Sequence, residues 1–227
     1  MNVSRFRLPR RRLRPLAAAA ALAALLLVLA GRTPADSDAS AVRVEEDWSL
    51  TVSAPNADIA SPQVSTQMAR SPWATHFCNF HLNSSDVPTF SQGGLQLQAW
   101  KGNSNVAVYT GPSAAVMSTS NELVTWTQYL SNETGSLTFG VKAASSTTWG
   151  DFSGIQITVP NSGTGLSNYD VNYSMQNSGV TFGANRVTSL TLVAYRVYYS
   201  DGSVYSDTTP RVVYSAALDP ALGGGAN

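Results

Sequence analysis

The chain contains a single cysteine, Cys78, so no disulfide can form within it. It has only two histidines, and charged residues make up 12% of its 227 residues, about half the share of a typical soluble domain. No window of a dozen residues keeps a helical period, and no internal repeat suggests a solenoid or a propeller. These absences exclude a disulfide scaffold and a repeat protein, and they leave a domain stabilised by its apolar core.

The N-terminus has the pattern of an export signal. Six arginines precede a run from Leu16 to Ala30 that contains only Leu, Ala and one Val. A run of about fifteen residues fits the apolar region of a signal peptide and is short for a transmembrane helix. We expect residues 1–41 to form a helical signal peptide cleaved after Ala30, Ala35 or Ala41, the last preferred because strand-like sequence begins there. An uncleaved signal anchor is the alternative.

Removal of this leader changes the charge of the protein. The full chain has 14 basic and 14 acidic residues, and residues 1–41 hold seven of the basic and two of the acidic ones, so 7 basic and 12 acidic residues remain. A mildly acidic domain without a basic stripe excludes nucleic acid as a partner. The signal peptide predicts a secreted, periplasmic or cell-surface protein that has no membrane contact after signal removal. The alanine-rich leader is typical of bacteria.

The remainder of the chain reads as short strands. Clusters of Gly, Pro, Asn and Ser recur about every 8 to 15 residues between runs rich in Val, Leu, Thr, Tyr and Phe. This spacing predicts an all-β, two-sheet antiparallel β-sandwich over residues 42–215 and a flexible tail over 216–227. We predict strands near 48–53, 75–82, 94–100, 106–109, 123–129, 137–142, 155–159, 171–174, 179–182, 189–199 and 203–207, and a short helical turn over 112–117.

Two turns predict hairpins. Asp201-Gly202 lies between aromatic and β-branched residues, and glycine supplies the positive φ that such a turn requires. A looser turn at Gly102 and Asn103 joins two further alternating runs.

The residue types of metal sites and hydrolases are sparse. His76, Cys78 and His81 are close in sequence, but alternation along a strand places Cys78 with the core and His81 on the opposite face, so we expect no metal site there. Glu45-Glu46-Asp47 is the one acidic cluster, beside the processing site. The other acids are single, near predicted turns, and read as surface residues: Asp86, Glu122, Glu133, Asp151 and Asp170. We expect no catalytic residues and no cofactor; calcium held by Asn168, Asp170, Asp151 and Asp86 is the alternative.

One predicted strand carries the candidate binding site. Gln96, Gln98 and Trp100 alternate with Leu95 and Leu97, so the two leucines face the core and the other three side chains form a row on the opposite face. Amides bond sugar hydroxyls, and a flat indole covers the apolar C–H face of a sugar ring. The row predicts a glycan site; an ordinary solvated strand face is the alternative.

Two further runs resemble a known family. The run from Gly135 to Lys142, followed by Ser145 to Phe152 with its Trp-Gly pair, resembles the paired strands of concanavalin A-like domains. The run from Gly94 to Trp100 is similar to a strand of their laminin G-like members. The resemblance implies a jelly-roll sandwich that binds or cleaves polysaccharides. The Glu-x-Asp-x-x-Glu strand of the glucanase branch and the calcium loop of the lectin branch have no equivalent in this sequence.

Three functional hypotheses follow. The first is a secreted, non-catalytic domain that binds an extracellular glycan or envelope component through Gln96, Gln98 and Trp100. The second is a structural or cell-envelope surface protein without a small-molecule site. The third is a polysaccharide hydrolase that uses scattered carboxylates.

Overall fold

The computed structural model describes residues 39–53, 62–69, 76–83, 94–113, 121–133, 135–160, 165–182 and 186–216. Its strands are β1 (Ala41–Val52), β2 (Gln63–Ala69), β3 (His76–Leu82), β4 (Gly94–Lys101), β5 (Ser104–Ser113), β6 (Glu122–Glu133), β7 (Ser136–Ser146), β8 (Gly150–Asp151), β9 (Ile155–Pro160), β10 (Gly179–Phe182), β11 (Val187–Tyr199), β12 (Val204–Asp207) and β13 (Arg211–Ser215). One described helix, α2 (Val171–Gln176), lies between β9 and β10.

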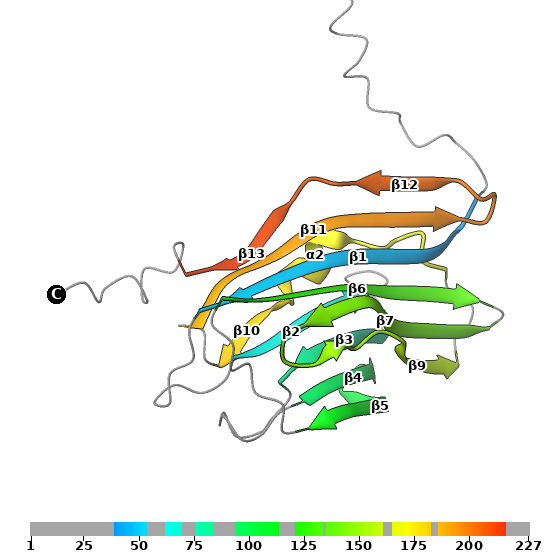
Figure 1. Cartoon of the computed structure of the whole chain (residues 1–227). Coiled ribbons are helices and arrows are strands. Elements are labelled where there is room, and N and C mark those ends of the chain that lie inside the picture. Colours follow the sequence, from blue (N-terminus) through cyan, green and yellow to red (C-terminus); the bar gives the residue numbers. More distant parts are fainter. Residues whose placement is uncertain are drawn as a thin grey trace, which may run out of the picture. The chain divides into compact units, whose positions relative to one another are not determined.

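The strands form two antiparallel sheets that face one another (Figure 1). The eight-stranded sheet has the order β12-β11-β1-β6-β7-β8, with β13 also paired to β11 and β9 to β7. The five-stranded sheet has the order β10-β2-β3-β4-β5. The predicted all-β, two-sheet sandwich is therefore confirmed, and β1 is a central strand between β11 and β6.

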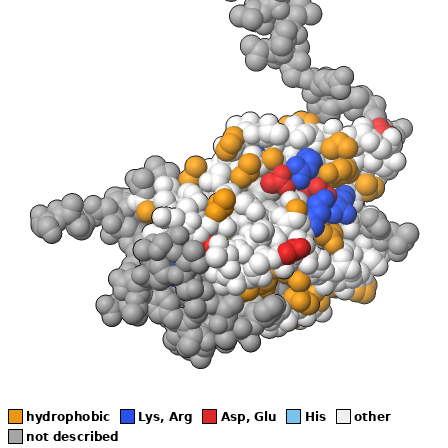
Figure 2. Space-filling view, viewed as in Figure 1, with side chains coloured by type: hydrophobic (Ala, Val, Ile, Leu, Met, Phe, Trp, Pro, Cys, Tyr) orange, Lys and Arg blue, Asp and Glu red, His pale blue; other side chains and the backbone are white. Residues whose placement is uncertain are grey.

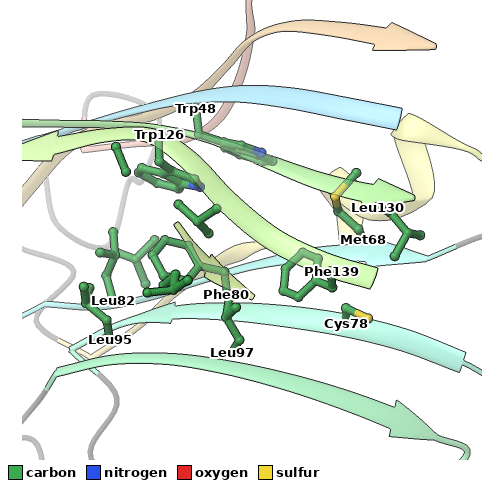
Figure 3. Close-up of a cluster of buried hydrophobic side chains, with 14 of the residues drawn as sticks. Trp48, Met68, Cys78, Phe80, Leu82, Leu95, Leu97, Trp126, Leu130 and Phe139 are labelled. Atoms are coloured by element: carbon green, nitrogen blue, oxygen red, sulfur yellow. The ribbon is translucent and has the colours of Figure 1, made fainter. Parts of the chain in front are cut away.

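The inner faces of the two sheets enclose one apolar core (Figure 3). Trp48 of β1 and Trp126 of β6 stack with ring centroids 6.2 Å apart, and Phe80 of β3 meets Trp126 edge-on at 5.6 Å. Leu95 and Leu97 of β4 are buried in the same core, as alternation predicts. Period-two burial therefore decides which side chains of each strand remain for other contacts.

Most predicted strands are present, usually longer than predicted, with three differences. Residues 171–174, predicted as a strand, belong to α2; β2, β8 and β13 were not predicted; and Pro112, predicted in a helical turn, lies in β5. Residues 1–38 and 217–227, which include most of the predicted signal peptide and tail, lie outside the described residues, as do 114–120. The described part of the chain includes no helix long and apolar enough to cross a membrane.

Both predicted hairpins are present. β11 and β12 pair from Tyr198 opposite Val204 onward, and Gly202 in the turn has φ +84°. Asp201 Oδ1 accepts hydrogen bonds from the Ser203 backbone N–H at 2.8 Å and hydroxyl at 2.6 Å, which fixes this turn. In the hairpin of β4 and β5, Gly102 has φ +57°. Glycine adopts these left-handed conformations without a Cβ penalty.

Candidate functional site

Gln96, Gln98 and Trp100, here called the amide row, lie along β4 on the outer face of the five-stranded sheet. All three side chains are half-buried. The Trp100 indole N–H donates to Gln98 Oε1 at 2.9 Å, and Gln98 Nε2 donates to Gln96 Oε1 at 2.5 Å. Gln96 Nε2 in turn donates to Thr110 Oγ1 of β5 at 3.4 Å. The structure thus brings the three predicted residues into one chain of hydrogen bonds.

The strands on either side of β4 widen this polar face. Phe77 of β3 is opposite Trp100, and the two rings are parallel within 4° with centroids 6.1 Å apart. Asn79 of β3 and Val108 of β5 flank Gln98. Phe77 and Asn79 alternate with the buried Cys78 and Phe80, so both lie on the outer face of β3. That this strand is the neighbour of β4 had no signal in the sequence, because pairing is a non-local property.

His81 lies on the same outer face, opposite Gln96. Its Nδ1 is 2.6 Å from Ser65 Oγ, whereas its Nε2 is buried and has no hydrogen-bond partner among the described residues. Burial lowers the pKa of His81, although the neighbouring Gln98 side chain opposes the shift. At neutral pH this ring is therefore an uncharged polar group beside the amide row.

The predicted separation of the His/Cys trio is confirmed. Cys78 is buried in the core, whereas His81 lies on the outer face of the same strand. Within the described ranges, no three His, Cys, Asp or Glu side chains are grouped so that they could hold a metal ion. Asp170, named for the calcium alternative, accepts the backbone N–H of Asn172 at 2.9 Å and caps α2; Asp86 lies outside the described residues.

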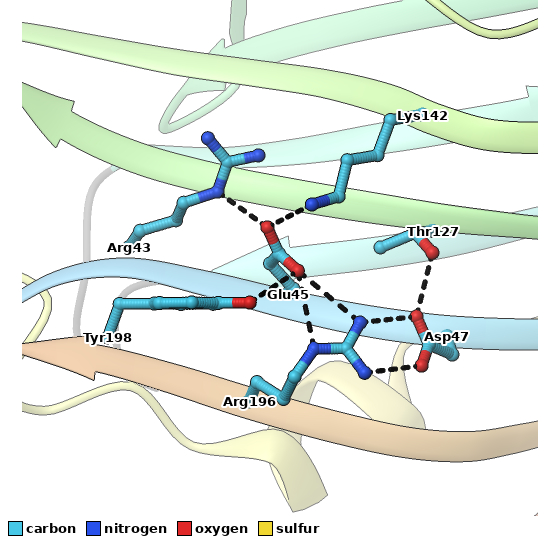
Figure 4. A network of polar contacts seen from close by, with 7 residues as sticks. All are labelled: Arg43, Glu45, Asp47, Thr127, Lys142, Arg196 and Tyr198. Atoms are coloured by element: carbon cyan, nitrogen blue, oxygen red, sulfur yellow. Dashed lines mark hydrogen bonds and ion pairs between the residues drawn. The ribbon is translucent and has the colours of Figure 1, made fainter. Parts of the chain in front are cut away.

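A second polar feature, the charged cluster, lies on the outer face of the eight-stranded sheet (Figure 4). It consists of Arg43, Glu45 and Asp47 of β1, Thr127 of β6, Lys142 of β7, and Arg196 and Tyr198 of β11. Figure 2 shows these charges gathered on one part of the face with apolar side chains around them. The acidic run at Glu45 and Asp47 was visible in the sequence, but its pairing with Lys142 and Arg196 was not, because these residues come from strands that are distant in the chain.

Glu45 is at the centre of the charged cluster, and its side chain is 3% exposed. It accepts hydrogen bonds from Arg43 Nε at 2.7 Å and from the Tyr198 hydroxyl at 3.0 Å, and it pairs with Lys142 and, at 3.3 Å, with Arg196. Burial opposes its ionisation, but the hydrogen bonds and positive charges outweigh burial and lower its pKa. Glu45 is therefore an ionised, fully partnered carboxylate.

Asp47 is held by the same arginine. Arg196 donates to both of its oxygens at 2.7 Å, and Thr127 Oγ1 donates to Oδ1 at 2.7 Å. Burial again opposes ionisation, but the hydrogen bonds from Arg196 and Thr127 lower the pKa of Asp47. A shallow, open depression beside this pair is lined by Ser49, Thr125, Ala143 and Val193.

Tyr129 of β6 borders the charged cluster and depends on a glycine. A Cβ at Gly140 would lie 2.6 Å from the Tyr129 ring, so only glycine leaves room for this ring. The Arg43 guanidinium lies over the ring at 4.1 Å, and the Tyr129 hydroxyl donates to Gln156 at 2.8 Å. These contacts hold Arg43 in place beside Glu45.

The acids described on β1 lie on opposite faces of the strand. Glu46 points from β1 into the core, away from Glu45 and Asp47, and is fully buried. Glu122, predicted at the surface, is 1% exposed. Its carboxylate accepts hydrogen bonds from the Thr148 backbone N–H at 2.8 Å and from the Thr148 hydroxyl at 2.7 Å, which compensate for its burial. On the charged face both carboxylates have lowered pKa values, so neither is suited to the proton-donating role of glycoside hydrolysis.

Comparisons of this chain with family models, with curated proteins and with solved structures each find no match. The residues of the amide row and of the charged cluster are therefore the basis for a proposal about function.

Proposed function

We propose that this protein is an exported, non-catalytic binding domain that recognises an extracellular carbohydrate through Trp100, Gln98 and Gln96. The supporting observation is the hydrogen-bonded row itself, in which a half-buried indole ends a line of amides on the outer face of a sheet. The ligand class follows from the match between amides and sugar hydroxyls and between an aromatic ring and the C–H face of a sugar.

Preorganisation favours this role. The bonds from Trp100 to Gln98 and from Gln98 to Gln96 hold each side chain in one rotamer, so a ligand does not bear the entropy cost of ordering them. Phe77 lies parallel to Trp100 and supports the indole from the neighbouring strand. Such a flat, shallow platform suits a polymer that lies across a sheet.

The amide row is a better candidate than the charged cluster. In the cluster, Glu45 and Asp47 are bound by the arginines, the lysine, Thr127 and Tyr198. A ligand would have to replace these charge-assisted hydrogen bonds, each of which is stronger than a bond between neutral groups. We assign the cluster a structural role that joins β11, β1, β6 and β7.

Binding by the purified protein to a glycan array and to insoluble polysaccharides tests the proposal. Replacement of the indole in Trp100→Ala is expected to weaken binding at least about tenfold, since a single aromatic anchor commonly contributes more than about 1.4 kcal/mol. Gln98→Ala should weaken it less. Tyr205→Ala, at an exposed aromatic side chain on β12, is the matched control and should bind normally. Equal binding by Trp100→Ala and the wild-type protein would reject the site.

A structural role in the cell envelope is the second candidate. The observation that favours it is β5, a strand at the end of the five-stranded sheet on which Val106 and Val108 are exposed. Co-fractionation of the protein with envelope material, together with no binding to any glycan on the array, would favour this role over the first.

A further inference from the structure

β5 forms one end of the five-stranded sheet and differs from an ordinary protected edge. Among the described strands it pairs with β4 alone, and Figure 1 shows it as the outermost strand of its sheet. It extends over ten residues, Ser104–Ser113, and its sequence SNVAVYTGPS contains no charged residue. A strand edge of this kind presents unpaired N–H and C=O groups that can add another strand.

The other described edges are short or carry charge. β10, at the opposite end of the same sheet, has four residues. β9 has six residues and ends at Pro160. β12 and β13 have four and five residues, with Pro210 between them, and Arg211 pairs with Asp207 at 2.6 Å. Short strands, prolines, charges and β-bulges are the usual means by which proteins block edge pairing. From Ser104 to Gly111, β5 has no proline and no charge. Its ladder with β4 shifts register at Val106 and again between Thr110 and Ser113.

The exposed side chains of β5 are also unusual. Val106 is 45% exposed and Val108 is 52% exposed. Val108 is opposite Gln98 and so lies on the outer face. Val106 is the extra residue where the β4–β5 ladder shifts register, and its side chain is also exposed. Two adjacent β-branched side chains on an edge strand favour cross-strand packing with a further strand.

We propose that β5 pairs antiparallel with β5 of a second copy, so that two five-stranded sheets become one continuous sheet. A two-fold axis at Ala107 brings Val106 of each copy next to Val108 of the other. No like charges meet in this register, because the strand has no charge. A two-fold pair uses the same surface on both subunits, and this uncharged strand is complementary to itself. The inference depends only on the edge and does not require the glycan proposal.

Sedimentation velocity over a range of protein concentrations tests the pairing, with reductant present so that Cys78 cannot crosslink unfolded chains. The wild-type protein is expected to show a reversible monomer–dimer equilibrium. The double variant Val106→Lys, Val108→Lys places lysines opposite lysines and should raise the dissociation constant at least about tenfold. The matched control is Val204→Lys with Val212→Lys, which changes side chains 50% and 52% exposed on β12 and β13 of the eight-stranded sheet. This control should dimerise normally.

Hydrogen exchange identifies the interface. Backbone amides of β5 should gain protection as the concentration rises, whereas those of β12 should not. A monomer at every concentration up to about 1 mM would overturn the proposal, and so would a dimer that the lysines on β5 leave unchanged. Protection of β5 in a monomer would also overturn it, since another segment would then occupy the edge. Circular dichroism and urea unfolding of the lysine variants show whether the fold remains intact.

Discussion

Glu46 is the buried ionisable residue with the largest consequences. The Trp48 indole donates to it at 3.0 Å, Gln128 Nε2 donates at 2.7 Å, and the Tyr169 hydroxyl donates to its other oxygen. Gln128 also accepts from Thr66 of β2 at 2.6 Å. The carboxyl group therefore belongs to a polar network that connects the two sheets through the core.

This network makes stability depend on pH. Burial raises the pKa of Glu46 from 4.5 to about 7, although three hydrogen bonds oppose the shift. Between these values the unfolded chain releases a proton that the folded protein keeps. The free energy of unfolding should therefore be highest below about pH 4.5 as far as Glu46 is concerned, fall by roughly 3 kcal/mol up to about pH 7, and stay level above it.

Urea unfolding of the wild-type protein and Glu46→Gln across this range measures the effect. The variant cannot ionise, so the difference between the two proteins should grow from about pH 5 to pH 7 in favour of the variant. The difference in unfolding free energy between the two proteins is the quantity to compare. The lowered pKa of His81 makes stability rise with pH, but this effect is the same in both proteins and cancels in the difference. A difference that does not change with pH would assign the titration to another group.

At the scale of an element, α2 shows how local chemistry can override a strand-like composition. Val171-Asn172-Tyr173-Ser174 reads as a strand by residue type, yet the segment is helical. Asp170 accepts the backbone N–H groups of Asn172 and Tyr173 and so caps the first turn. An aspartate at this position is a helix-start signal that the sequence did contain.

Removal of this cap should loosen the segment. Asp170→Ala leaves two N–H groups without their acceptor and is expected to lower the free energy of unfolding by about 1 kcal/mol. Asp170→Asn keeps an acceptor oxygen and should lower the free energy of unfolding by only a few tenths of a kcal/mol. Chemical denaturation of both variants gives the comparison, and equal losses in the two would show that the cap is not the cause.

The strands show what a single sequence can predict. Alternation correctly placed Leu95 and Leu97 in the core and Gln96, Gln98 and Trp100 together on the other face, because each follows from the period of one strand. Pairing could not be predicted in this way. The charged cluster, the position of β3 beside β4 and the central place of β1 depend on contacts between segments far apart in the chain.

At the scale of the whole molecule, the two outer faces have different chemistry. The outer face of the eight-stranded sheet carries charges that bind one another, whereas that of the five-stranded sheet carries amides and aromatic rings. A face whose charges are already paired stabilises the sheet, and a face of uncharged donors and acceptors is suited to exchange partners with a ligand. This division is the physical basis for assigning binding to β4.

Ser40 and Ala41, beside the cleavage site that the sequence predicts, make contacts across the molecule. Ala41 is the first residue of β1 and is 3% exposed, and its carbonyl accepts the Leu166 N–H at 3.3 Å. The Ser40 carbonyl accepts the Ser200 N–H at 2.9 Å, and the Ser40 N–H donates to Ser200 Oγ at 3.1 Å. Cleavage after Ala41, the site that the sequence favoured, would remove both residues from these contacts.

For the proposed export, we therefore expect cleavage after Ala30 or Ala35, which would leave Ser40 and Ala41 in place. Intact-mass measurement of the exported protein gives the cleavage position directly. A recombinant chain that begins at residue 42 should be less stable than one that begins at residue 36 by about 1 to 3 kcal/mol, because it lacks a buried side chain and three hydrogen bonds. An exported protein that begins at Val42, or equal stability of the two chains, would contradict this expectation and show that β1 does not need its first residue.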